Sequence, residues 1–248
     1  MSTINAEIMK YEIPYDQLQI IGLSATMVDA LPESVKTSLT SGELTPLILL
    51  RREMENGVVL SMPMKLRMDD TPDGGSRLLI YPMNTELKNS LNLSEKDFRS
   101  LKEGDIINVA GTLHQRDPET NCIVSKREKQ LELDRRIAEL EKVRDIELGT
   151  EQKNQLKEGK PVELNVGGEK VTVGLDLRDK DHFKTLKGDM QEWKRQQEID
   201  YDIAHPEFVG LVQTDQNRWE KQMVSKEGLN SQTLKEQPAQ TRSSGMRI

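Results

Sequence analysis

One stretch of the sequence, residues 146–177, constrains the fold more than any other, because it has the pattern of a short helix, a glycine and a hairpin. Thr150 is placed to cap the helix with its hydroxyl, and Gly159 lies where helices commonly end in the left-handed conformation. Beyond it, two runs of alternating apolar and polar residues flank Gly167 and Gly168. Two adjacent residues that tolerate positive φ are typical of a type I′ hairpin turn. The stretch therefore predicts a helix followed by two antiparallel strands.

A similar pattern precedes this stretch. Residues 101–104 and residues 156–159 share the sequence Leu-Lys-Glu-Gly, and a looser third copy ends at Gly42. The recurrence predicts an internal repeat. The earlier copy would contain a helix capped by Ser94, a strand at residues 106–109, a loop at residues 117–121 and a return strand at residues 122–124.

The remaining segments predict an α+β chain in which repeated helix–hairpin units form small antiparallel sheets. Residues 58–68 alternate after an Asn-Gly turn, as in a strand, whereas apolar residues recur every three to four positions from Leu133 to Val143, as in an amphipathic helix. Almost nothing after Val224 can be buried, which predicts disorder. The predicted parts are an α+β domain at residues 1–125, a charged linking helix at residues 126–147, a helix–hairpin repeat at residues 148–188, and a partly helical, then disordered tail at residues 189–248.

Composition narrows the function classes. The formal net charge of −7 argues against nonspecific binding to nucleic acid, which usually requires a basic surface. A single cysteine, Cys122, excludes an internal disulfide and suits a reducing compartment. The longest apolar run, residues 47–50, is far shorter than a membrane span, and the first residues have no signal-peptide pattern. We therefore expect a cytoplasmic protein that does not contact a membrane.

No pattern in the sequence predicts catalysis. His114, His182 and His205 have no cysteine or carboxylate at metal-ligand spacing, and residues 179–182 favour a polar loop over a metal site. Neither a phosphate-binding loop nor a dinucleotide-binding motif occurs. We expect no cofactor, no metal and no enzymatic activity.

Two groups of side chains remain as candidate contact surfaces. Methionines on one face of the predicted strand either fill a core or offer an adaptable surface to a partner; these are Met62, Met64 and Met68. Basic residues in the same sheet are either ordinary surface charge or contacts for phosphate or an acidic partner; these are Arg51, Arg52, Lys65, Arg67 and Arg77.

The motif that begins at Ile146 also resembles a known kind of domain. Its residues are Ile146, Leu148, Thr150, Gln152, Leu156, Gly159, Lys160 and Val162. Together with the hairpin, this motif resembles repeat domains of unassigned activity that are encoded on conjugative and related mobile elements of gut anaerobic bacteria. Residues 11–111, with Tyr11, Ile13, Pro14, Tyr15 and Leu18 at their start, resemble a companion domain often found upstream. The resemblance implies mobile-element or phage biology and no catalytic residue.

The sequence thus favours a non-enzymatic interaction or scaffold module that binds a partner protein through sheet and helix surfaces. The partner is either another protein or a second copy of the same chain. The alternative is a nucleic-acid accessory factor, for mobilisation or DNA processing, that uses the basic face of the first sheet.

Overall fold

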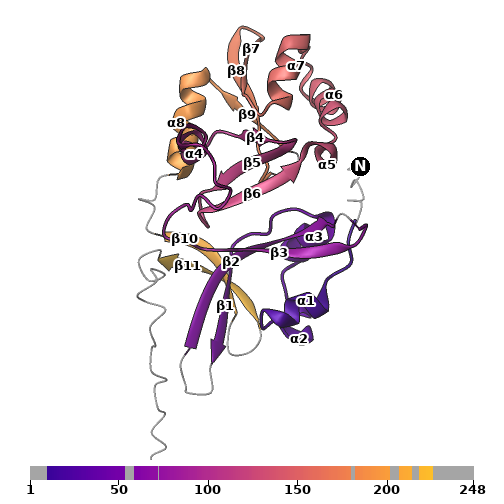
Figure 1. Cartoon of the computed structure of the whole chain (residues 1–248), viewed down its shortest axis with the longest axis vertical. Coiled ribbons are helices and arrows are strands. Elements are labelled where there is room, and N and C mark those ends of the chain that lie inside the picture. The colour runs from indigo at the N-terminus through magenta and orange to yellow at the C-terminus, as the bar shows by residue number, and fades with distance from the viewer. Residues whose placement is uncertain are drawn as a thin grey trace, which may run out of the picture. The chain divides into compact units, whose positions relative to one another are not determined.

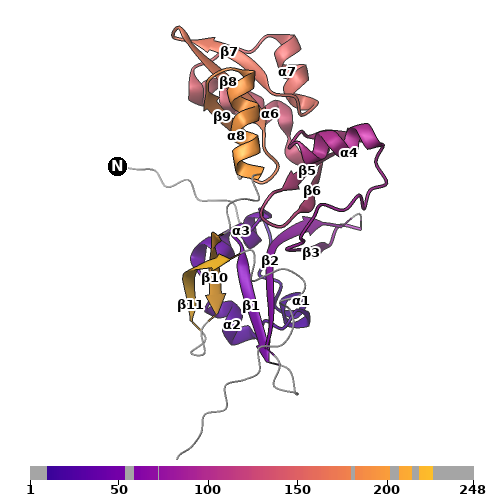
Figure 2. The ribbon, with the colours of Figure 1, turned by 90° about the vertical axis from the view of Figure 1, so that its left-hand side faces the viewer.

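The chain folds into two compact units, shown in Figure 1 and Figure 2. The computed structural model describes residues 10–53, 59–71, 73–179, 182–201, 207–213 and 218–225. The first unit is built from both ends of the sequence, residues 1–85 and 205–248, and the second unit is residues 86–204. Helices and largely antiparallel sheets occur in both units, which confirms the predicted α+β class.

Short helices cover one face of the first unit's sheet. Their bounds are α1 Tyr15–Ile20, α2 Ala25–Asp29 and α3 Glu33–Ser41. The hydroxyl of Ser24 accepts from the Met27 N–H and so caps α2. Gly42 ends α3 with a φ of +76°, where an added Cβ would lie 2.5 Å from the Tyr11 ring. Glycine is therefore required at the predicted stop, both for its backbone conformation and for space.

The first unit's sheet has the strand order β11-β10-β1-β2-β3. Neighbouring strands are antiparallel, except that β10 runs parallel to β1 and places Leu211 opposite Ile48. Leu211, Ile48, Met64 and Leu66 join buried side chains from α1–α3 in one core. The strand bounds are β1 Ile48–Glu53, β2 Val59–Asp70, β3 Ser76–Pro82, β10 Glu207–Gln213 and β11 Trp219–Ser225.

The strands β10 and β11 correct the predicted tail at residues 189–248. Leu211 is buried in the core of the first unit, and Trp219 Nε1 donates to the Met27 carbonyl at 3.2 Å. The chain therefore returns to its first sheet, and residues 1–125 are not one continuous domain. The predicted disorder beyond residue 225 and the Asn-Gly turn at residues 56–57 lie outside the described residues.

Two segments of the second unit share one order of elements: a helix, a glycine and a three-stranded antiparallel sheet. We name them the α4 segment, residues 95–127, and the α7 segment, residues 150–187. The α4 segment comprises α4 Glu95–Lys102, β4 Ile107–Val109, β5 Thr112–Asp117 and β6 Cys122–Arg127. The α7 segment comprises α7 Thr150–Lys157, β7 Val162–Val166, β8 Glu169–Leu175 and β9 Phe183–Lys187.

Glycines end both helices as the sequence predicts. Gly104 and Gly159 have φ values of +94° and +81°, and Gly167 and Gly168 have +61° and +85° in the turn between β7 and β8. The hairpin predicted around Gly167 and Gly168 is confirmed as β7 and β8, to which β9 adds a third strand. In the α4 segment the predicted strand and return strand exist as β4 and β6, but the prediction that they pair is wrong, because β5 lies between them and pairs with both. The N-cap of α7 is Gly149 and not the predicted Thr150.

The charged stretch at residues 126–147 forms two helices and not one linker: α5 Glu128–Leu131 and α6 Leu133–Arg144, separated by Glu132 at a φ of +46°. Ile137 of α6 packs into the core formed with α7, β7 and β8, so α6 belongs to the second unit. The helix α8, Met190–Tyr201, lies on the other face of that sheet from α7, as Figure 1 and Figure 2 show. Its Trp193 packs against Gly174 of β8. None of the described helices has the length and apolar run needed to cross a bilayer.

Candidate interaction surfaces

The methionines considered as a partner-binding face lie inside the first unit. Met64 and Met68 are 4% and 2% exposed in the core beneath α1–α3, and Met62 packs against the same core. Their flexible side chains fill the space between sheet and helices. The alternative prediction, a surface for a partner, is therefore wrong for Met64 and Met68, because the helices already cover that face.

The predicted basic face is also not formed as expected. Lys65 and Arg67 are 7% and 1% exposed, and the Arg67 guanidinium carbon lies 5.8 Å from the centre of the Tyr81 ring. Arg77 is exposed and forms an ion pair of 3.4 Å with Asp69 on the neighbouring strand. The side chains of Arg51 and Arg52 lie outside what the structure describes. Burial of Lys65 and Arg67 removes the two central charges of the predicted phosphate contact.

Buried polar contacts join the two segments of the second unit. Gln115 Oε1 on β5 accepts from the Leu177 N–H at 2.7 Å, and these residues are 2% and 1% exposed. His182 Nδ1 lies 2.6 Å from the Asp179 carbonyl, and its Nε2 lies 3.1 Å from Lys126 Nζ on β6. Because a carbonyl only accepts, Nδ1 carries the proton and Nε2 accepts from the ammonium. The loop between β8 and β9 is thus fixed onto the sheet of the α4 segment.

Carboxylates stabilise the loop that follows β8 and the turn between β5 and β6. Asp176 accepts from Arg178 Nε and Nη2 at 2.8 and 2.7 Å, and Asp117 accepts from the Thr120 hydroxyl at 2.7 Å. Burial raises the pKa of Asp176, but the hydrogen bonds and charge of Arg178 outweigh it, so the pKa lies below its usual value. Burial lowers the pKa of His114, whose Nδ1 is 2.7 Å from Ser125 Oγ. The described residues contain no group of three or more potential metal ligands.

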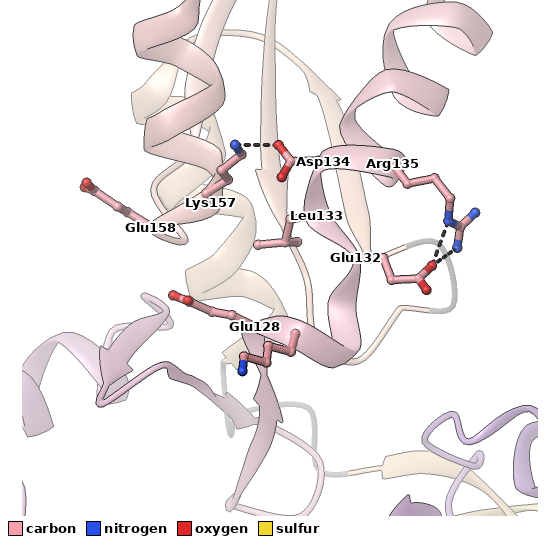
Figure 3. Close-up of a pocket in the computed structure, with 8 residues that line it drawn as sticks. Glu128, Glu132, Leu133, Asp134, Arg135, Lys157 and Glu158 are labelled. Atoms are coloured by element: carbon pink, nitrogen blue, oxygen red, sulfur yellow. Dashed lines mark hydrogen bonds and ion pairs between the residues drawn. The ribbon is translucent and has the colours of Figure 1, made fainter.

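A hollow of about 590 Å³ lies where α5, α6 and the end of α7 meet. We name it the α5–α7 hollow, and Figure 3 shows its lining: Glu128, Lys129, Glu132, Leu133, Asp134, Arg135, Lys157 and Glu158. The break at Glu132 turns the chain between α5 and α6, so that both helices contribute to one concave surface. Lys157 of α7 reaches Asp134 of α6 at 2.5 Å, and Arg135 pairs with Glu132 at 2.6 Å.

Most of the charged side chains that line the α5–α7 hollow are exposed, whereas Glu128 and Lys157 are half-buried. The Lys157–Asp134 and Arg135–Glu132 ion pairs each join two residues of this lining. The Asp134 side chain is 87% exposed, and the Arg135 pKa is raised by hydrogen bonds from its guanidinium to Glu132 and Glu139. Leu133 is the only apolar residue among those lining this hollow, and the aliphatic stems of the charged side chains also contribute to its surface. The hollow is suited to charged contacts between proteins.

The sequence interpretation missed these surfaces. In β5, Thr112–Asp117, the only apolar residue is Leu113, so a search for alternating apolar residues passes over the strand. The regular charge spacing in α6 was the available signal for the hollow. Comparison of the chain with protein-family models, curated proteins and solved structures finds no match.

Proposed function

We propose that the chain is a non-enzymatic interaction module whose second unit binds a partner protein at the α5–α7 hollow. The observation that supports this proposal is the set of solvent-exposed ion pairs from α6 and α7, such as Lys157 with Asp134. Exposed pairs of this kind contribute only about 0–1 kcal/mol to folding. Their charges can therefore re-pair with those of a partner at little cost to stability.

The context of the proposal comes from the sequence. We propose that the α4 and α7 segments are copies of one repeat, and that the module serves a mobile element or phage in the cytoplasm. Burial of Lys65 and Arg67 takes away the feature that favoured a nucleic-acid accessory factor, so we do not carry that alternative forward.

The test is capture of partners by the full chain from a lysate of the source cells, compared among the wild type and three variants. Lys157→Glu and Arg135→Glu reverse charges of the hollow, whereas Lys96→Glu reverses an exposed charge on α4 as the matched control. We expect at least one protein to be retained by the wild type and by Lys96→Glu and to be lost with both hollow variants. Equal capture by all forms, or a monomer that retains nothing, would contradict the proposal.

A further inference from the structure

A different surface of the second unit presents an open strand edge. β7 is the outer strand of the sheet β7-β8-β9, and its two-residue turn makes Val166 and Glu169 the hydrogen-bonded pair that closes the hairpin. Hydrogen-bonded pairs alternate along the hairpin, so the backbone N–H and C=O groups of Glu163 and Asn165 point away from β8. Within the described residues, no backbone or side-chain group bonds to these outward groups.

The far side of the neighbouring strand supports this register. Lys170 is the partner of Asn165, and its carbonyl accepts from the Gly188 N–H at 2.8 Å, beside β9. A residue of β8 whose backbone bonds toward β9 does not bond toward β7, so Asn165 keeps its donor and acceptor for another strand.

A hollow of about 380 Å³ lies beside this edge. We name it the β7 groove, lined by Asp145, Ile146, Glu147, Gln152, Glu163, Leu164, Asn165, Val166 and Gly167. It contains carboxylates of Asp145, Glu147 and Glu163 and no lysine or arginine. Lys170, just outside the lining, lowers the pKa of Glu163 through a hydrogen bond and keeps that group ionised. Because Lys170 also offsets the charge of Glu163, the excess negative charge of the groove comes from Asp145 and Glu147, beside a row of free backbone groups.

We propose that the β7 groove binds an extended, basic peptide segment of a partner protein, which adds to the sheet as a further strand. Backbone bonds to Glu163 and Asn165 would supply affinity, and alternate side chains of the peptide would supply specificity. Ile146 packs in one core with Leu164 and Val166, so residues 145–147 lie on that face of the sheet. Lysine or arginine side chains on the same face of the peptide would meet Asp145 and Glu147, and its apolar side chains would lie on the opposite face. The inference does not depend on the α5–α7 hollow, which lies at the other end of α7.

The test is fluorescence anisotropy with the full chain and a labelled peptide of alternating lysine and valine. We expect saturable binding that weakens at high salt and is absent for a peptide of alternating glutamate and valine. Asn165→Pro removes an outward N–H at a position where an edge strand tolerates proline, and should weaken binding about tenfold or more. The double variant Asp145→Asn with Glu147→Gln should do the same, whereas Glu103→Gln, at an exposed carboxylate after α4, should have no effect.

A backbone-methylated form of the lysine–valine peptide separates strand addition from simple charge attraction, because it keeps the charges and loses the donors. Binding of this form as tight as that of the parent peptide, or an Asn165→Pro variant that binds normally, would overturn the proposal. Absence of any binding by the lysine–valine peptide would overturn it as well. Lys157→Glu should leave peptide binding unchanged, so failure here and failure of the proposed function are distinguishable.

Discussion

Replacing Gly159 by alanine tests the feature on which the second unit's architecture depends, the glycine that ends α7. At a φ of +81°, an alanine costs about 1–2 kcal/mol in backbone strain alone. Its Cβ would also lie 2.6 Å from Cγ2 and 2.8 Å from Cβ of Ile106. Because Cβ is fixed close to the backbone, Ile106 cannot simply rotate away, and overpacking of this kind costs about 1–3 kcal/mol. We expect Gly159→Ala to destabilise the second unit by about 2–5 kcal/mol.

The matched control is Gly168→Ala in the turn between β7 and β8. Gly168 has a φ of +85°, but an added Cβ there meets no atom within 4 Å. Gly168→Ala should lower the free energy of unfolding by the backbone strain alone, about 1–2 kcal/mol. The difference between the two variants therefore measures the contact with Ile106.

Urea unfolding of the full chain, followed by Trp193 fluorescence, provides the measurement. The chain has two tryptophans, and a Trp219→Phe background leaves Trp193 as the reporter of the second unit. Equal losses for Gly159→Ala and Gly168→Ala would refute the steric part of the reasoning. A Gly159→Ala protein as stable as its parent would refute all of it. In an Ile106→Ala background, Gly159→Ala should lower the free energy of unfolding by less than it does in the wild type, because the side chain that it contacts is shorter.

Two further predictions concern the buried polar contacts. Gln115→Ala should lower the free energy of unfolding by about 1–3 kcal/mol, because it leaves the buried Leu177 N–H without its acceptor. Amide hydrogen exchange at Leu177 should accelerate, and an unchanged exchange rate would count against the contact. The lowered pKa of Asp176 stabilises the fold above the unfolded value of about 3.9, and this stabilisation is lost as pH falls through the folded pKa. Asp176→Asn should therefore be less stable at neutral pH and show a flatter decline in unfolding free energy below about pH 4; a decline as steep as that of the wild type would contradict this.

Local signals explain the parts of the fold that were predictable. Gly42, Gly104 and Gly159 each end a helix because their left-handed conformation is a property of the residue itself. Gly167 and Gly168 form the predicted turn for the same reason. Ser94 caps α4, with its hydroxyl accepting from the Asp97 N–H at 3.1 Å. Such features involve residues a few positions apart, so a single sequence contains them.

Contacts between distant segments were decided by the tertiary structure alone. The pairing of β10 with β1 depends on Leu211 finding the core around Ile48, and nothing near Leu211 in the sequence specifies that neighbour. The same applies to Arg67, whose charge suggested an exposed surface although the folded chain buries it. Among the candidate surfaces, the β7 edge follows from a predictable hairpin, but its acidic lining needs Asp145 and Glu147 to be brought beside it. Backbone preferences are local and can therefore be predicted from the sequence. The burial and charge of a surface depend instead on which remote segments of the chain pack together to form it.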